Sequence, residues 1–318
     1  MTSKLGFGLA LQNYVAAGES LGSRELLRLG VTAENLGFTS VWVWDHLLLG
    51  SQKVFPVQES LSVLTAVAVS TEVVRLGTGI LILPIRNPIE LAKRVATIDD
   101  LSNGRVTLGV AAGWYEREFR ACGVLFETRG KQLETNIEIM RKLWSEDRVT
   151  GTYGRYELKN VNMEPKPIQK PNIPLWLGGY TEKAHERLGR LGDGWVSYFY
   201  NPESFKRSWE RILENTQRAS RDPTKLGNCN MLPVRVGDNM EDSSQILKAF
   251  IGKYCDLPAW SEATAESGIV GSAKDCIASI ESYVEAGVQN IVIMPAVANL
   301  SEIDQQVKRF ATEVVRSF

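Results

Sequence analysis

Asp45 and His46 are adjacent in the chain, at the end of the segment SVWVWDH, whose alternating apolar residues predict a β-strand. The chain has only two histidines, and this one follows a strand end. An imidazole can accept or give a proton near neutral pH, and a neighbouring carboxylate can orient it. The pair is therefore our candidate for acid–base chemistry. A histidine that only hydrogen-bonds to Asp45 is the structural alternative.

Other kinds of catalytic site have little support in the sequence. His185 falls in the middle of a predicted helix, where we expect it on the surface, so the clustered ligands of a metal site are missing. Glu116 and Glu118 lie just inside another predicted helix, where acidic side chains favour its positive end. Asp45 is then the only carboxylate expected at a strand end. A glycosidase needs two carboxylates in one cleft, and no GxSxG motif marks a nucleophilic serine.

Short segments of small residues follow or interrupt other predicted strands. GGYT, residues 178–181, opens a helix directly after a strand, where backbone N–H groups and the Thr181 hydroxyl suit a phosphate. A plain glycine turn with Thr181 as the helix N-cap is the alternative. AAG, residues 111–113, would let a flat ring approach the backbone. Gly77 and Gly79 interrupt a bulky strand, which predicts a bulge or a close backbone contact, with simple packing as the alternative.

Eight predicted strands alternate with helices and must position these residues. Several strands, such as TGILILP and NIVIMP, are continuously apolar, as strands buried on both faces are. This alternation predicts an α/β fold with a closed parallel barrel, the (β/α)8 TIM barrel, whose catalytic residues follow the carboxyl ends of the strands. A doubly wound open sheet is the second possibility, but GxGxxG and P-loop motifs are absent. The predicted strands are residues 4–11, 39–46, 74–84, 105–113, 173–179, 193–199, 228–237 and 288–295.

The chain is predicted to form one domain over residues 1–318, with two insertions. Residues 149–172 combine β-prone and proline-rich parts and predict an inserted hairpin, and residues 238–272 predict a partly helical insertion. The net charge of −1 is evenly mixed, which does not favour a nucleic-acid or membrane partner. No signal-peptide core or run of about 20 apolar residues occurs, and four scattered cysteines lack a CxxC motif, so we expect a cytoplasmic protein.

Three long segments resemble the luciferase-like monooxygenase superfamily in order and spacing. They begin LGTGILILPIRNP at Leu76, FETRGKQLETN at Phe126 and EPKPIQKPNIPLWLGG at Glu164. The resemblance implies a barrel with insertions, usually a homodimer, that uses either FMN or coenzyme F420. The overall pattern is most similar to the F420-dependent branch. Partners implied are a small-molecule substrate and a separate flavin or F420 reductase.

The resemblance also implies roles for particular residues. His46 matches a histidine beside the cofactor ring that gives a proton or stabilises the reacting species, and Asp45 matches its partner near the cofactor. Gly79 and Ile80 match a position where the family often has a non-prolyl cis peptide behind the ring. The cofactor's tail and phosphate are expected against Ala112, Gly113 and Trp114, and against Gly178, Gly179, Tyr180 and Thr181.

Departures from the family pattern disfavour some of the functions that occur in the family. Light-emitting members have an arginine where this chain has Ala112, and a reactive cysteine where it has Ala111. Light emission is therefore not expected, and one contact to the FMN phosphate is missing. Sugar-phosphate dehydrogenases of the F420 branch have a catalytic glutamate where this chain has Trp114. Aromatic and apolar residues near the strand ends instead predict an apolar substrate pocket, formed by Trp44, Leu48, Tyr115, Tyr198 and Tyr200.

The sequence therefore predicts an F420-dependent oxidoreductase that transfers hydride to or from a small apolar or aromatic substrate. The alternative is an FMN-dependent monooxygenase that uses reduced flavin and O₂. A non-catalytic flavin-binding member of the family is a third possibility, which the retention of His46 disfavours. In every case the cofactor carries the redox chemistry, while the protein orients it and keeps the site dry.

Overall fold

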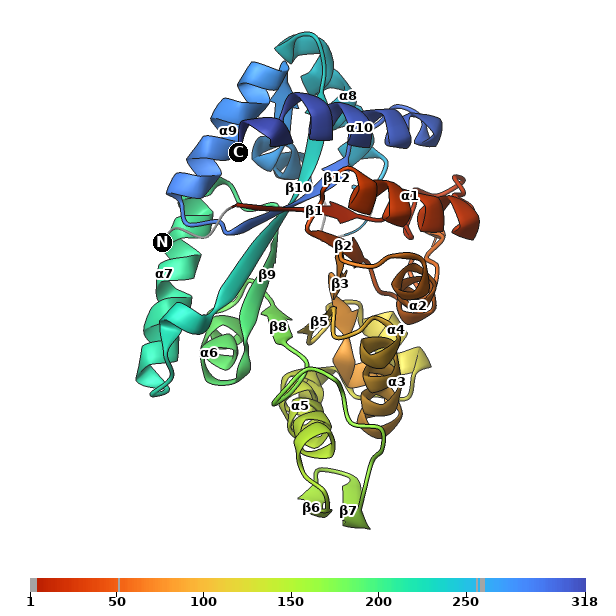
Figure 1. The fold of residues 1–318 in the computed structure, drawn as a ribbon, viewed down its shortest axis with the longest axis vertical. Coiled ribbons are helices and arrows are strands. Elements are labelled where there is room, and N and C mark those ends of the chain that lie inside the picture. The colour runs from red at the N-terminus through yellow and green to blue at the C-terminus, as the bar shows by residue number, and fades with distance from the viewer. Residues whose placement is uncertain (1–4, 51, 256, 258–260) are drawn as a thin grey trace.

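The computed structural model describes residues 5–50, 52–255, 257 and 261–318. Its central feature is a ring of parallel strands in which each strand pairs with the next and β12 closes the ring between β10 and β1 (Figure 1). The ring is the closed parallel barrel that the alternation of strands and helices predicts. Its strands are β1 (Gly6–Ala10), β2 (Ser40–Val43), β3 (Arg75–Thr78), β5 (Val106–Ala111), β8 (Leu175–Gly178), β9 (Gly194–Tyr198), β10 (Gly227–Val236) and β12 (Asn290–Pro295).

Helices surround the barrel, as the same alternation predicts. Asn87 caps α3 by accepting the N–H of Ile89 at 2.9 Å, and Pro88, whose ring suits this position, is the first helical residue. Ser23 is the first residue of α1, which follows Gly22. No helix of the described residues is long and apolar enough to cross a membrane. The helices are α1 (Ser23–Asn35), α2 (Ser60–Ser70), α3 (Pro88–Leu101), α4 (Glu116–Ala121), α5 (Arg129–Ser145), α6 (Glu182–Leu191), α7 (Pro202–Arg218), α8 (Met240–Gly252), α9 (Ala273–Glu285) and α10 (Ile303–Glu313).

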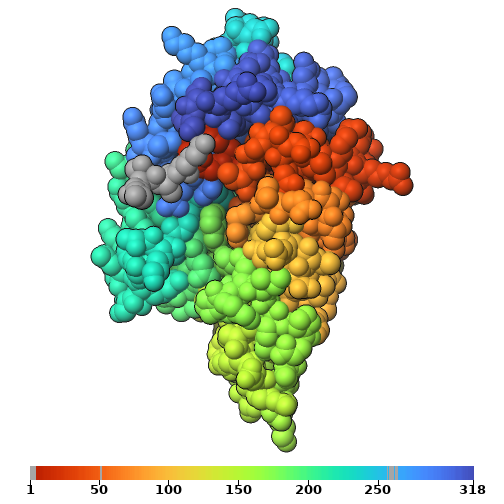
Figure 2. All heavy atoms as spheres, in the orientation of Figure 1, coloured from red at the N-terminus to blue at the C-terminus, as the bar shows by residue number. Residues whose placement is uncertain are grey.

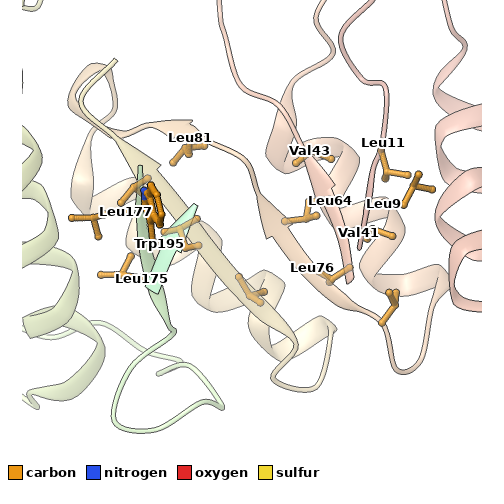
Figure 3. Close-up of a cluster of buried hydrophobic side chains, with 14 of the residues drawn as sticks. Leu9, Leu11, Val41, Val43, Leu64, Leu76, Leu81, Leu175, Leu177 and Trp195 are labelled. Carbon is orange, nitrogen blue, oxygen red and sulfur yellow. The ribbon is translucent and has the colours of Figure 1, made fainter. Parts of the chain in front are cut away.

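The apolar core has two layers because successive side chains of a strand point to opposite faces. Along β2, Val41 and Val43 belong to the outer layer between strands and helices, whereas Trp42 between them belongs to the barrel interior. Figure 3 shows Leu9, Val41 and Leu76 of this outer layer on β1, β2 and β3. The outer layer fixes the helices to the barrel and so fixes the loops at its carboxyl end.

The predicted third strand is interrupted at its glycines. It forms β3 and then β4 (Leu81–Ile82), and the peptide between Gly79 and Ile80 is cis, as the resemblance implies. A Cβ at Gly77 would lie 2.2 Å from the Trp42 ring, and a Cβ at Gly79 would lie 2.2 Å from the Met231 methyl group. Both glycines therefore make room for side chains inside the barrel.

The two predicted insertions differ in form. Residues 149–172 contain the expected hairpin, β6 (Val149–Tyr153) with β7 (Tyr156–Val161), which projects from the lower end of the ribbon in Figure 1 and forms the narrow tip in Figure 2. The second insertion contains α8 and also β11 (Ile269–Gly271), which extends the sheet beside β10. The sequence did not predict β11, because three residues are too few to show a strand pattern.

Candidate active site

A cavity of about 580 Å³ opens at the carboxyl ends of the barrel strands. Most of its lining comes from residues that follow strands, which is where this fold places catalytic groups. Trp44, Asp45 and His46 follow β2, and residues 111–114 lie at the end of β5. Residues 178–181 lie at the end of β8, and Tyr198 and Phe199 lie at the end of β9. Ile80 and Ile82 line the cavity from the interrupted third strand.

His46 is held by a carboxylate that the sequence did not single out for catalysis. Its Nδ1 lies 2.9 Å from Oε2 of Glu118, whose side chain is fully buried. The other oxygen of Glu118 accepts the backbone N–H groups of Leu47 and Leu48, the second at 3.0 Å. Because Nδ1 faces Glu118, Nε2 is the ring nitrogen left for the cavity that His46 lines.

This pairing corrects two expectations. Glu118 was expected only to favour the positive end of its helix, yet α4 carries it inward to meet the end of β2. The structural alternative for His46 was a hydrogen bond to Asp45, yet its partner is Glu118. A histidine oriented by a buried carboxylate is an arrangement suited to proton transfer.

Asp45 is engaged in holding the cavity wall together. Its buried carboxylate accepts from Arg86 at 2.6 Å, from the Ser60 hydroxyl at 2.9 Å and from the N–H of Ile82 at 2.9 Å. These contacts fasten the end of β2 to β4 and α2. Asp45 therefore lines the cavity beside His46, as predicted, while its oxygens bind protein groups.

The loop after β8 presents unpaired donors to the cavity. Among the residues that the structure describes, no hydrogen bond is donated by the backbone N–H of Gly179, Tyr180 or Thr181. The Thr181 side chain caps α6 by accepting the N–H of Ala184 at 3.2 Å, so the cap and the free donors occur together. Consecutive free N–H groups at a helix start bind anions such as phosphate.

Gly178 and Gly113 shape the wall between this loop and the strand ends. A Cβ at Gly178 would lie 2.0 Å from the Ile80 side chain. Gly113 has a φ of +82°, and a Cβ there would lie 2.8 Å from both Ile82 and Phe119. Both glycines let apolar side chains pack into the wall, which keeps this part of the cavity smooth and apolar.

Three basic side chains that the sequence did not single out lie around the same end of the cavity. Lys183 and Arg187 come from α6, and Arg129 comes from the start of α5. Arg187 is paired with Glu134 at 2.8 Å, whereas Arg129 donates to the carbonyl of Phe126 at 3.0 Å. No ion pair joins Arg129 or Lys183 to a described carboxylate. Arg129 and Lys183 are therefore available to an anionic ligand.

Aromatic residues line the cavity near His46. Trp114 meets the His46 ring edge to face at 5.4 Å, and Trp44 lies against Tyr198 at 5.2 Å and Tyr14 at 6.0 Å, all between ring centres. Burial raises the pKa of the Tyr198 phenol well above its ordinary value, so it stays neutral.

The predicted site residues divide into two groups. Trp44 and Tyr198 line the cavity, as do Ile80, Ala112, Gly113, Trp114 and residues 178–181. Four predicted residues do not line the cavity: Leu48, Tyr115, Tyr200 and Gly79. Leu48 is 54% exposed, and the Tyr115 hydroxyl donates to the carbonyl of Gly50. Tyr200 stacks on Tyr180, and Gly79 faces Met231.

His185 is buried, which corrects the expectation of a surface histidine. Its ring lies edge to face with Trp195 at 5.9 Å between ring centres, and burial lowers its pKa. No group of three or more potential metal ligands occurs among the residues described in the structure.

Comparison with known proteins agrees with this architecture. The family described as luciferase-like monooxygenase matches residues 5–290. The chain belongs to this family. A relative named F420-dependent glucose-6-phosphate dehydrogenase, from Amycolatopsis mediterranei, is 34% identical over 88% of this chain and 90% of its own length.

Another relative is named for the second cofactor expected from the sequence. The FMNH2-dependent dimethylsulfone monooxygenase of Pseudomonas putida is 28% identical over 61% of this chain and 53% of its own length. The crystal structure of monooxygenase RslO1 from Streptomyces bottropensis shares the fold, with a TM-score of 0.85, 20% identity and coverage of 98% and 99% of the two chains. The named relatives are thus oxidoreductases and monooxygenases, the enzyme class that the sequence predicts.

Proposed function

We propose that the chain is a coenzyme F420-dependent oxidoreductase that transfers hydride to or from a small, uncharged, apolar or aromatic substrate. The proposal rests on a cavity that combines an oriented histidine, an anion-binding loop and an apolar wall. The 34% identical relative is named for dependence on F420.

The described residues fit such a cofactor. The free N–H groups of residues 179–181 are donors for its phosphate, and the apolar wall of Ile80, Ile82 and Gly113 suits a flat ring. When bound, F420 would supply hydride acceptance and donation.

The observation that favours F420 over FMN is the basic lining at the phosphate end of the cavity, where Arg129, Lys183 and Arg187 outnumber one carboxylate, Glu127. The loop alone offers donors enough for one phosphate, and FMN has no further anionic group. F420 carries carboxylates beyond its phosphate, in its lactyl and glutamyl tail. Arg129 and Lys183, which have no carboxylate partner among the described residues, match these added charges.

The protein's own contribution to the reaction centres on His46. Nε2 would hold or move a proton at the substrate while Glu118 keeps the ring in one orientation through Nδ1. The aromatic wall excludes water and positions an apolar substrate beside this nitrogen.

The charge distribution of the cavity bears on the kind of substrate it accepts. The basic residues of the cavity lining, Arg129, Lys183 and Arg187, all come from α5 and α6, and α6 directly follows the anion-binding loop. Among the described residues, the lining at Trp44, Tyr14 and Tyr198 has no lysine or arginine for a second phosphate. A neutral substrate therefore fits this end better than a sugar phosphate.

The double variant Arg129→Gln/Lys183→Gln removes the two cations that would bind the carboxylates of F420. We expect its Kd for F420 to rise about tenfold at low ionic strength, because each exposed charge contact contributes up to about 1 kcal/mol. Its Kd for FMN should change less than about threefold. Fluorescence titration measures both constants.

Lys131→Gln is the matched control, since Lys131 is an exposed lysine on α5 that does not line the cavity. The wild-type preference for F420 should also weaken with added salt, because salt screens exposed charges. An equal loss of FMN and F420 affinity in the double variant would remove the argument for the longer anionic tail.

A homodimer, a separate reductase partner and a cytoplasmic location are expected from the sequence and its family resemblance. All three stay predictions.

A further inference from the structure

Asn13 follows the end of β1 by three residues and lies beside the end of β2, the neighbouring strand of the barrel (Figure 1). Only 1% of its surface is exposed. Its Oδ1 accepts the backbone N–H of Trp44 at 2.8 Å, and its Nδ2 donates to the carbonyl of the same residue at 2.9 Å. The side-chain amide thus pairs with both main-chain groups of Trp44, as a residue of an adjacent strand can, one residue beyond the end of β2.

Asn13 also joins this pair to the segment before α2. Its Nδ2 donates a second hydrogen bond, to the carbonyl of Gln58, at 2.9 Å. The backbone N–H of Gln58 in turn donates to the Asn13 carbonyl at 2.7 Å. Both N–H groups of the side-chain amide therefore face carbonyl oxygens, which fixes the way the amide is turned. One buried side chain connects three separate segments of the chain.

Each of these segments contributes one residue to the cavity at the end that the proposed function gives to the substrate. Tyr14 follows Asn13, Val57 precedes Gln58, and Trp44 is bound directly, and all three neighbours line the cavity. Tyr14 and Val57 also form an antiparallel bridge. We refer to Tyr14, Trp44 and Val57 as the substrate wall. Its three members are thus held together through Asn13.

The residues that follow Trp44 have anchors of their own. Glu118 holds His46 at 2.9 Å, and Arg86 holds Asp45 at 2.6 Å. Without the Asn13 amide, the N–H and the carbonyl of Trp44 lose these buried partners, and the main chain has to move to regain hydrogen bonds. The loss should therefore disturb the substrate wall more than the histidine or the anion-binding loop.

We propose that Asn13 is a positioning residue that fixes the main chain of Trp44 and so sets the affinity of the substrate wall for an uncharged aromatic substrate. The inference rests on the part of the proposed function that places such a substrate against this wall. It does not depend on the choice between F420 and FMN.

Asn13→Leu tests this role, because leucine has nearly the shape of asparagine and no hydrogen-bonding group. The probe is 2-naphthol, an uncharged aromatic compound, titrated by calorimetry into protein that is saturated with the oxidised cofactor the wild type binds more tightly. Saturation keeps the probe out of the position of the cofactor ring. The two measured quantities are the Kd for 2-naphthol and, in a separate titration, the Kd for the cofactor.

Asn228 offers a matched control at the opposite end of the barrel. It is fully buried, and its side chain donates to the carbonyl of Gly287 at 3.0 Å and accepts the N–H of Gln289 at 2.8 Å. It lies near the amino end of β10, whereas the cavity opens at the carboxyl ends of the strands. Asn228→Leu therefore removes a similar pair of hydrogen bonds and separates a general loss of stability from a change in the substrate wall.

We expect Asn13→Leu to raise the Kd for 2-naphthol about tenfold, because the wall then has to be ordered on binding, and to change the cofactor Kd less than about threefold. Asn228→Leu should leave both constants within about twofold of the wild type, because it touches neither site. If Asn13→Leu does not fold, Asn13→Ser replaces it with the same expectation and with Asn228→Ser as its control. Serine is too short to reach both groups of Trp44, and it leaves room for water to solvate them.

Three results would overturn the proposal: an unchanged Kd for 2-naphthol in the Asn13 variant, an equal rise in the Asn228 variant, or equal losses of probe and cofactor affinity. A wild type that does not bind 2-naphthol would overturn it together with the apolar substrate of the proposed function. The preferred cofactor of the wild type is decided separately. A preference for FMN would therefore reject F420 dependence and leave the comparison of the Asn13 and Asn228 variants decisive.

Discussion

Replacing His46 with alanine is expected to reduce turnover by about a hundredfold or more, the usual contribution of a general acid or base. The cofactor Kd should stay within a few-fold of the wild type, because His46 lines the cavity apart from the anion-binding loop after β8. The physical reason is the loss of Nε2, the ring nitrogen that Glu118 leaves free for the cavity. Steady-state kinetics and fluorescence titration of the same preparation measure the two quantities.

His46→Gln is a useful companion variant, because it keeps polarity and size but cannot take up a proton at neutral pH. It should be nearly as slow as the alanine variant. Turnover close to that of the wild type in either variant would assign His46 a structural role and leave proton transfer without a protein group.

The second large effect is expected at Glu118. Glu118→Ala leaves the N–H groups of Leu47 and Leu48 without their buried acceptor and frees the His46 ring. We expect the free energy of unfolding to fall by about 3 kcal/mol and turnover to fall at least tenfold. Urea denaturation and steady-state kinetics measure these changes.

Glu118→Gln separates the two roles of this side chain. Its amide oxygen can still accept the backbone N–H groups, so stability should fall less than in the alanine variant, while the altered contact with His46 still lowers turnover. Glu116→Gln is the control, since Glu116 pairs with Arg120 at the surface and should change stability by less than about 0.5 kcal/mol.

A double variant tests whether Glu118 acts through His46. Residues that act as one unit have strongly non-additive effects on turnover. The His46→Ala/Glu118→Gln protein should therefore be no slower than His46→Ala alone. Multiplying losses would show that Glu118 contributes to the reaction by a separate route.

The barrel could be predicted because its signals are local. Apolar strands such as NIVIMP differ in period from the amphipathic helices between them, and Asn87, Pro88 and Thr181 mark helix starts by their own chemistry. The strand ends then follow from the element order, which placed His46 and residues 178–181 at the same end of the barrel before any contact was known.

The residues that were missed depend on contacts across the chain. Glu118 meets His46 from 72 positions away, through a six-residue helix whose inward face has no clear period. Arg129 and Lys183 are far apart in sequence and meet at one cavity only because α5 and α6 are neighbours in the closed ring.

His185 is different, because a local signal for its burial existed. It stands three and four residues before the buried Leu188 and Gly189, a spacing that places all three on one face of α6. This helical periodicity predicts that the His185 ring faces inward, although histidine is polar.

The most direct test of F420 dependence is a side-by-side titration of the purified wild-type protein with F420 and FMN, each oxidised and reduced, followed by fluorescence quenching. The cavity's phosphate loop and its added cations predict that F420 binds at least tenfold more tightly than FMN. Tight binding of reduced FMN with no binding of F420 would contradict the proposal and would indicate an oxygen-consuming monooxygenase.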